Sequence, residues 1–383
     1  MTGLTVGVVG ASARAAVGSL LRASFGAWAV DLFADRDLVR CVPAIRCPLD
    51  RYPEALPQLC AAFPPGPVLY TGGLENAPAV VAELGRHRPL WGNGPEVLAL
   101  ARSPSHIQTI LAPCGPLPAL IPPNGVAPLT GRWLRKSRGG SGGFGIRPAQ
   151  PGEMPTPTHD IQELIDGLSM SAQFVSDENT TTLLGVTEQL IAERWLHAAP
   201  FRYCGNLGPV MITDLLSARL CRFGSRLAAE TGLRGVWGMD FILRDDVPFP
   251  VEVNPRYTSA IEVLEHATGM PVLNAHADCF GTTTAPSQDR RPARSGIVGK
   301  AIYYAPHRIV FPHDGPWCGD LDIALGPWQL PGFADIPPTG ERIEAGSPVL
   351  TFFAAGSTIE ACRVILKEIA ADLDRLFAEE QSP

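Results

Sequence analysis

The sequence predicts a mixed α/β and α+β fold in three units, on the strength of three observations. An apolar strand-like run, a helical run and a second apolar run open the chain in β–α–β order. Two later apolar runs, joined by a polar turn at residues 244–247, predict an antiparallel hairpin. A length of 383 residues exceeds what one compact core usually holds, so we expect two or three domains.

The first unit is predicted to span residues 1–100 and to contain a parallel sheet. "LTVGVVG", from Leu4 to Gly10, is its first strand, and a helix follows that ends near Gly26. "AWAVDLFADRD" supplies the second strand. A later strand runs into the glycine turn of "GPVLYTGG", and residues 88–104 supply the last strand and helix.

The second unit is predicted to span residues 101–295, and the third residues 296–383. The second unit contains a helix-like segment from Ser103, a strand–glycine loop–strand at 131–149, strand segments within 161–191, a helix at 212–232, the hairpin, and a helix at 259–269. A polar, proline-containing linker is expected at 285–296. A strand at 297–305 and an amphipathic helix at 359–380 define the third unit.

The composition argues against several classes of protein. A net charge of −7 creates no field that would attract nucleic acid, so we expect no nucleic-acid partner. The nine cysteines are scattered singly, without a CxxC pair or zinc-site spacing, which predicts reduced thiols in a cytoplasmic protein. We also expect no signal peptide, membrane span or membrane partner, because Arg14 and Arg22 interrupt the N-terminal apolar run.

The stretch "FPVEVNPRYTSAIEVLE" carries the strongest chemical signal. Glu252, Asn254 and Arg256 alternate along a strand and therefore share one face. A turn near residue 246 places Asp240 of the first hairpin strand opposite Glu252. Two carboxylates and an amide oxygen are hard ligands that suit Mg²⁺, and Arg256 could offset charge on a transferring phosphoryl group. The alternative is a surface hairpin in which Glu252 and Arg256 form a salt bridge.

Two weaker signals precede the hairpin. "KSRGGSGGFG", from Lys136 to Gly145, exposes backbone N–H groups that can surround phosphate oxygens, although no GK[ST] follows as in a P-loop. A plain flexible hairpin loop is the alternative. "QELIDG", from Gln162 to Gly167, could present backbone groups to an adenine edge, with Asp166 near the ribose, but it could also be an ordinary strand end.

In this order the three signals resemble the ATP-grasp superfamily, over roughly Ser103 to Gly269. The resemblance implies two α+β subdomains that clamp ATP. It also implies that Lys136 and the glycines contact phosphates, that the backbones of Glu163 and Ile165 contact adenine, and that one or two Mg²⁺ ions, or Mn²⁺, bind at the hairpin with Glu252 bridging. The expected nucleotide-binding residues are Lys136, Gly139, Gly140, Ser141, Gly142, Gly143, Gln162, Glu163, Ile165 and Asp166. The expected metal ligands are Asp240, Glu252 and Asn254, and the expected catalytic residues are Arg256 and Lys136.

The flanking units also resemble those of this superfamily. "GVVGASARAA…VDLFAD" looks like its N-terminal Rossmann-like, or pre-ATP-grasp, domain in a predicted carboligase branch related to biotin carboxylase, and "KAIYYA…ERIEAGSPVLTFFAAG" resembles its small C-terminal closing domain. The chain departs from the pattern at one place. Many family members have an upstream lysine where this chain reads "ARSPSHIQ", and Arg102 is the candidate substitute.

The resemblance implies an ATP-dependent ligase that activates a carboxylate as an acyl-phosphate for capture by an amine or thiol. Small-molecule carboxylate and amine substrates are the expected partners, and a homodimer is consistent with the family. The alternatives are a bicarbonate-activating carboxylase-type enzyme, a non-catalytic ATP-binding module, and an NAD(P) oxidoreductase suggested by "GVVGAS" with Asp31. Arg14 is a candidate for holding a substrate carboxylate.

Overall fold

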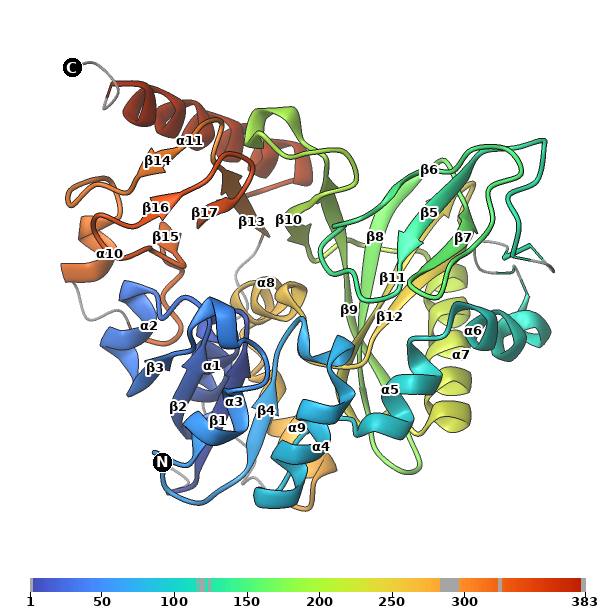
Figure 1. Cartoon of the computed structure of the whole chain (residues 1–383), viewed down its shortest axis with the longest axis horizontal. Coiled ribbons are helices and arrows are strands. Elements are labelled where there is room, and N and C mark those ends of the chain that lie inside the picture. Colours follow the sequence, from blue (N-terminus) through green and yellow to red (C-terminus); the bar gives the residue numbers. More distant parts are fainter. Residues whose placement is uncertain are drawn as a thin grey trace.

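The computed structural model describes residues 3–115, 117, 121–122, 125–282, 296–322 and 326–379. Within these residues the strands form sheets of four, eight, two and three strands, and helices pack against the larger two (Figure 1). The mixed α/β and α+β fold class predicted from the sequence is confirmed. No helix of the described part is both long and apolar enough to cross a bilayer.

The N-terminal unit is a parallel sheet in the order β3-β2-β1-β4. Its strands are β1 (Thr5–Gly10), β2 (Gly26–Asp31), β3 (Ala44–Arg46) and β4 (Val68–Tyr70). Its helices are α1 (Arg14–Arg22), α2 (Arg36–Cys41), α3 (Leu56–Cys60), α4 (Pro78–His87) and α5 (Pro95–Ala101). The strand expected after residue 88 is reduced to a single parallel bridge between Val68 and Leu90.

A small antiparallel sheet, in the order β6-β5-β7, stands apart from the N-terminal unit (Figure 1). It contains β5 (Trp133–Ser137), β6 (Arg147–Pro148) and β7 (His159–Glu163), and the glycine-rich loop connects β5 to β6. Helices α6 (Pro104–Leu111) and α7 (Asp214–Thr231) contact each other, and α7 packs on strands of the large sheet. Thr213 caps the start of α7. Gly232 ends the helix in the left-handed conformation, and the sequence predicts this stop.

The large sheet is antiparallel and runs in the order β12-β11-β8-β9-β10-β13-β17-β15. Its strands are β8 (Leu168–Ser176), β9 (Thr181–Ile191), β10 (Tyr203–Gly208), β11 (Gly235–Arg244), β12 (Val247–Asn254), β13 (Ile297–Tyr304), β15 (Phe333–Ala334) and β17 (Pro348–Gly356). Strands on both sides of residue 295 therefore belong to one sheet, and this sheet crosses the expected boundary between the second and third units. Most of the expected linker, residues 283–295, lies outside the described residues.

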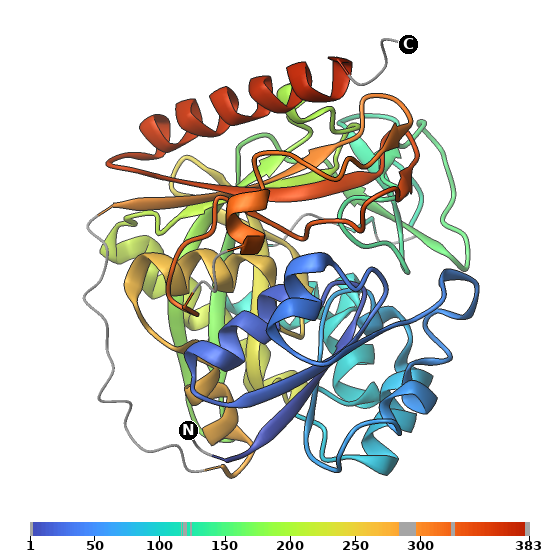
Figure 2. The same cartoon turned by 90° about the vertical axis from the view of Figure 1, so that its left-hand side faces the viewer.

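The remaining helices and strands lie outside these three sheets. They are α8 (Ser259–Thr268), α9 (Val272–Cys279), α10 (Cys318–Asp322), α11 (Ile359–Glu379), β14 (Ile309–Val310) and β16 (Arg342–Ile343). Strands β14 and β16 pair with each other. Figures 1 and 2 place α8 between the N-terminal sheet and the large sheet, and α11 along the outer side of the large sheet. Contacts of α8 with α1 on one side and with β10 on the other make it the joint between these two bodies.

The hairpin formed by β11 and β12 has the register that the sequence predicts. Asp240 pairs with Glu252, and the turn residues Asp245 and Asp246 both have positive φ, which matches the twist of a two-residue hairpin turn. The register shifts between Asp240 and Phe241, so Val251 is an extra residue on β12.

Candidate functional site

A cavity of about 730 Å³ lies between the small sheet and the large sheet. The expected site residues that line it are Lys136, Ser141, Gly142, Gly143, Gln162, Glu163, Ile165, Asp166, Asp240, Glu252, Asn254 and Arg256. Gly139 and Gly140 belong to the same loop but are not among the lining residues. The structure therefore brings together the glycine-rich loop region, the segment after it and the hairpin, although Lys136 and Arg256 are more than 100 residues apart in the sequence.

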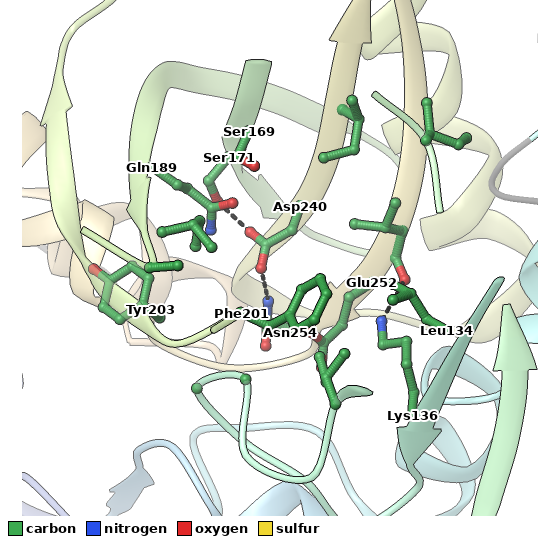
Figure 3. A pocket seen from close by; sticks show the side chains of 18 of the residues that line it. Leu134, Lys136, Ser169, Ser171, Gln189, Phe201, Tyr203, Asp240, Glu252 and Asn254 are labelled. Atoms are coloured by element: carbon green, nitrogen blue, oxygen red, sulfur yellow. Dashed lines mark hydrogen bonds between the residues drawn. The ribbon is translucent and has the colours of Figure 1, made fainter. Parts of the chain in front are cut away.

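Asp240 is the centre of a polar network on the floor of this cavity. Ser171 Oγ donates to Asp240 Oδ1 at 2.6 Å, and Asn254 Nδ2 donates to Asp240 Oδ2 at 3.0 Å (Figure 3). Gln173 in turn donates to Ser171 at 2.8 Å. Burial, and then the charge of the facing Glu252, raise the pKa of Asp240 to about 6.

Glu252 is bound by a cation from the N-terminal unit. Arg102, at the end of α5, donates from Nη1 to Glu252 Oε1. Its Nη2 donates to Asn76 Oδ1 at 3.0 Å and to the carbonyl of Gly140 at 3.4 Å. Burial would raise the pKa of Glu252, but the charges of Arg102 and Lys136 outweigh it and hold this pKa below its usual value.

The donor set at the hairpin fits a hard divalent cation. Asp240 and Glu252 are adjacent across the ladder, and Asn254 is hydrogen-bonded to Asp240. Among the described residues no three His, Cys, Asp or Glu side chains cluster as a metal site, so two carboxylates and one amide are what the protein offers here. Such a partial oxygen shell suits Mg²⁺, which usually keeps waters and shares the phosphates of a nucleotide.

Lys136 connects the small sheet to the hairpin. Its Nζ donates to the carbonyl of Val251 at 3.4 Å, and Gln162 Nε2 donates to the same carbonyl at 3.3 Å. The extra residue in β12 leaves this carbonyl outside the regular ladder, where both side chains from the small sheet reach it. Figure 3 shows Lys136 extending from its strand toward the hairpin, close to Glu252.

The glycine-rich loop is seated on the start of β10 and covers the cavity. Tyr203 N donates to the carbonyl of Gly142 at 3.1 Å. Gly143 has φ of +81°, and a Cβ there would lie 1.9 Å from the carbonyl oxygen of Phe201. The Arg202 guanidinium stacks over the ring of Phe144, 3.1 Å from its centroid.

The segment after β7 lines the cavity, but one expected contact there has another partner. Glu163 ends β7 opposite Trp133, and Ile165 is buried. Asp166, expected near a ribose, forms an ion pair with Arg132, and its side chain is 73% exposed. An exposed pair of this kind is weak, so Asp166 remains available to a ligand.

Arg256 is paired with an acid that sequence reasoning missed. Its Nη2 donates to Glu75 Oε1 at 2.7 Å and to Asn254 Oδ1 at 3.3 Å. The Glu75 side chain is 1% exposed and follows the glycine turn after β4. The surface-hairpin alternative requires Arg256 to pair with Glu252, whereas each of these residues is paired with the N-terminal unit. The turn "TGGLEN", at the carboxyl end of a parallel strand, was the available signal for Glu75.

Buried polar atoms without a partner surround this pair. Within the described ranges, Tyr52 Oη, Thr71 Oγ1, Glu75 Oε2 and Arg256 Nε have no hydrogen-bond partner. The first three come from the carboxyl-terminal side of the N-terminal sheet. Buried polar groups are usually satisfied, so this set fits water or a polar molecule at that edge.

Two other residues singled out from the sequence have structural partners. Arg14, considered for a substrate carboxylate, forms ion pairs with Glu262, Asp335 and Asp37, so the structure does not support that role.

Asp31, which suggested a dinucleotide site, accepts backbone hydrogen bonds from Ala13, Phe33 and Ala34, each at 2.6 Å. Its carboxylate is therefore used in shaping the loops of the N-terminal unit.

Comparisons with known proteins agree with this architecture. A family model described as an ATP-grasp domain matches residues 116–260. The carbamoyl phosphate synthase large chain of Rubrobacter xylanophilus is 28% identical over 177 residues, which are 45% of this chain and only 16% of that protein.

Solved structures show the same fold across nearly the whole chain. Biotin carboxylase from Campylobacter jejuni, solved with a β-γ-ATP ligand, has a TM-score of 0.66 at 14% identity and covers 96% of this chain and 90% of its own. L-amino acid ligase from Bacillus licheniformis has a TM-score of 0.65 at 14% identity and covers 97% of both chains. The chain therefore contains an ATP-grasp domain at residues 116–260, within a fold that it shares with these solved structures.

Proposed function

We propose that this protein is an ATP- and Mg²⁺-dependent ligase that activates a carboxylate as an acyl-phosphate, which an amine or thiol then captures. The observation that carries the proposal is the convergence of Asp240, Glu252 and Asn254 in one cavity, beneath a glycine-rich loop and beside Lys136. The similarity to a biotin carboxylase, an amino acid ligase and carbamoyl phosphate synthase supports ATP-dependent carboxylate activation as the reaction class.

In this proposal the cavity holds ATP along its length. The segment from Gln162 to Asp166 contacts the base and ribose, while Lys136 and the glycine-rich loop contact the phosphates. Asp240, Glu252 and Asn254 would hold one or two Mg²⁺ ions, which would neutralise phosphate charge.

The protein's own residues then act by position and charge. The substrate carboxylate attacks the γ-phosphorus, the bond between that phosphorus and the β–γ bridging oxygen breaks, and ADP leaves. Arg256, held in place by Glu75, offsets charge on the transferring group. An amine or thiol then attacks the acyl carbon, inorganic phosphate departs, and the nucleophile loses its proton. The seated loop excludes water, which would otherwise hydrolyse the acyl-phosphate.

We place the acceptor substrate at the carboxyl-terminal edge of the N-terminal sheet. The unpartnered polar atoms of Tyr52, Thr71 and Glu75 lie on that side of Arg256 and would hydrogen-bond to a polar acceptor. Residues 1–100 then serve as the acceptor-facing domain, and residues 101–295 supply the nucleotide-binding residues. Residues 296–383, whose strands continue the large sheet, serve as the closing part.

A phosphate-release screen tests the proposal. The protein is incubated with ATP, Mg²⁺ and pools of carboxylates and amines, and product masses identify the bond formed. We expect phosphate release only when a carboxylate is present, with a condensed product when an amine or thiol is added. Turnover with bicarbonate alone would favour the carboxylase-type alternative, and ATP binding without turnover in any mixture would favour a binding module.

A further inference from the structure

Arg102 links three parts of the candidate site that come from different segments of the chain. It lies at the C-terminal end of α5 and contacts Glu252 on the hairpin, Asn76 after β4, and Gly140 in the glycine-rich loop. Asn76 Nδ2 also approaches the Gly140 carbonyl, at 3.5 Å. Arg102 and Asn76 thus both contact the carbonyl of Gly140, and Arg102 also binds the carboxylate of Glu252.

The partner of Arg102 is the carboxylate that we assign to the metal. Glu252 faces Asp240 across the ladder, so this corner of the cavity concentrates negative charge. The Arg102 side chain is 14% exposed and that of Glu252 is 34% exposed. Partial burial of this kind makes a charge-assisted hydrogen bond stronger than a solvent-exposed surface pair.

A guanidinium and a divalent cation cannot share this carboxylate without cost. Like charges this close together repel, and a doubly charged ion repels the guanidinium more strongly than a singly charged one does. Arg102 must therefore give up Glu252, at least in part, when a metal ion binds there. The Gly140 carbonyl that Arg102 also contacts belongs to the loop expected to cover phosphates, so an anion under the loop lies within reach of the released guanidinium.

We propose that Arg102 is a surrogate cation, which neutralises Glu252 and holds the glycine-rich loop before loading, and which moves to the phosphates of the nucleotide once the metal takes Glu252. The inference rests on the proposed nucleotide and metal site and assigns to Arg102 a positioning role there. It also accounts for the absence of a lysine in "ARSPSHIQ", because Arg102 supplies the upstream positive charge from the neighbouring position in the chain. If the salt bridge between Arg102 and Glu252 were purely structural, Arg102 would keep the same contacts before and after the metal and nucleotide bind.

The test uses two variants. Arg102→Gln removes the charge and keeps a polar side chain, whereas Arg102→Lys keeps the charge but lacks the planar guanidinium that can bind two acceptors at once. Arg226→Gln is the matched control, because Arg226 forms an exposed pair with Glu230 on α7, away from the site. Two binding measurements need no turnover: Mn²⁺ alone, followed by electron paramagnetic resonance, and ATP at saturating Mg²⁺ without a carboxylate substrate, followed by calorimetry.

For Arg102→Gln we expect Mn²⁺ binding to strengthen about tenfold and ATP binding at saturating Mg²⁺ to weaken about tenfold, the change expected for one charge-assisted hydrogen bond. Arg102→Lys should fall between this variant and the wild type, and Arg226→Gln should match the wild type. Unchanged Mn²⁺ affinity in Arg102→Gln, with or without a lower Tm, would overturn the exchange and leave a structural salt bridge. Wild-type protein that binds neither Mn²⁺ nor ATP would overturn the proposed function, and this inference with it.

Discussion

At the scale of single residues, Glu252 is the side chain of the candidate site on which charges from three other segments converge. Arg102 binds its carboxylate, Lys136 lowers its pKa, and Asp240 faces it across the hairpin. Its two neighbouring cations keep it ionised, whereas burial and Glu252 itself keep Asp240 closer to its protonated form. Asp240 therefore takes up a proton more readily than Glu252 as the pH falls. A bound cation would reduce this difference, because it stabilises the ionised form of both carboxylates.

Replacing Glu252 with glutamine tests its assigned role with little change in shape. We expect ATP turnover to fall by at least about 10²-fold, because a charge that organises the reacting phosphates is lost. The Tm should stay close to that of the wild type, since the side chain is partly exposed. Phosphate release and thermal unfolding, measured on the same preparation, check both points. A variant with wild-type turnover would remove Glu252 from the metal site.

His276 gives a prediction about pH that is independent of the site. It is 2% exposed and accepts a hydrogen bond from Val236 N at 2.9 Å. Burial lowers the pKa of His276 to about 4, and the hydrogen bond to the Trp91 carbonyl raises this pKa only slightly. In the unfolded chain this histidine binds a proton below about pH 6.5, while in the folded chain it stays neutral until about pH 4, so its contribution to stability is lost as pH falls through that window.

We therefore expect wild-type protein to lose stability relative to His276→Gln by about 1.4 kcal/mol per pH unit between pH 6.5 and pH 4. Urea unfolding at several pH values measures this difference. The variant is destabilised at every pH by the loss of packing, so only the slope is diagnostic. Parallel curves for the two proteins would show that the histidine does not titrate differently on folding.

At the scale of structural elements, the glycine-rich loop depends on one close approach. Gly143 has positive φ and no room for a Cβ against the Phe201 carbonyl, whereas a Cβ at Gly139 would meet no atom within 4 Å. Gly143→Ala should therefore keep the loop from seating on β10. Gly139→Ala is a matched control in the same loop.

We expect Gly143→Ala to weaken ATP binding by about tenfold or more, with Gly139→Ala near the wild type, because hydrogen bonds from a preorganised loop to charged phosphates are lost. The global Tm should change little in both, since the loop lies outside the large sheet. Calorimetric titration with ATP and Mg²⁺ gives the affinities. Equal affinities for the two variants would mean that loop seating is not needed for binding.

The elements themselves were largely predictable from local patterns. The alternation of β12, the polar turn at residues 244–247 and the glycine that ends α7 each act over a few residues, so the register of Asp240 with Glu252 followed from the sequence. The seat of the glycine-rich loop was not predictable. Phe201 and Tyr203 lie about 60 residues further along the chain, and no short pattern links them to the loop.

At the scale of the whole molecule, α8 joins the N-terminal unit to the large sheet through buried polar contacts. Arg22 of α1 pairs with Glu265 of α8 at 2.7 Å, and the two side chains are 3% and 0% exposed. Ser19 and Tyr257 complete this network, with their hydroxyl oxygens 2.8 Å apart. The geometry of the candidate site depends on this joint, because Glu75 and Arg102 reach the hairpin only when the N-terminal unit is docked.

Breaking the joint should be costly. Arg22→Ala leaves the Glu265 carboxylate buried without its cation, and we expect a loss of about 3–5 kcal/mol in the free energy of unfolding. Arg226→Ala, which breaks an exposed pair on α7, should lose less than about 1 kcal/mol. Thermal unfolding of both variants measures the contrast. A similar small change in both would mean that the network at α8 is not what holds the units together.

The sequence did not reveal the contacts that Glu75 and Asn76 make at the site. Local patterns singled out the carboxylates, Lys136 and the glycine-rich loop, which line one cavity in the structure, whereas Glu75 and Asn76 acquire their contacts only through docking of the units. Long-range strand pairing is also why the domain boundary expected at residue 295 does not coincide with the edge of a sheet. Composition marked a linker there, whereas strand pairing continues from β10 to β13 within one sheet.

The most direct test of the account is a crystal structure with Mn²⁺ and a non-hydrolysable ATP analogue, in which the anomalous signal locates the metal. We expect manganese between Asp240, Glu252 and Asn254, with the phosphates under the glycine-rich loop and Arg102 turned from Glu252 toward them. Manganese bound elsewhere, or a nucleotide whose phosphates lie away from the hairpin, would contradict it.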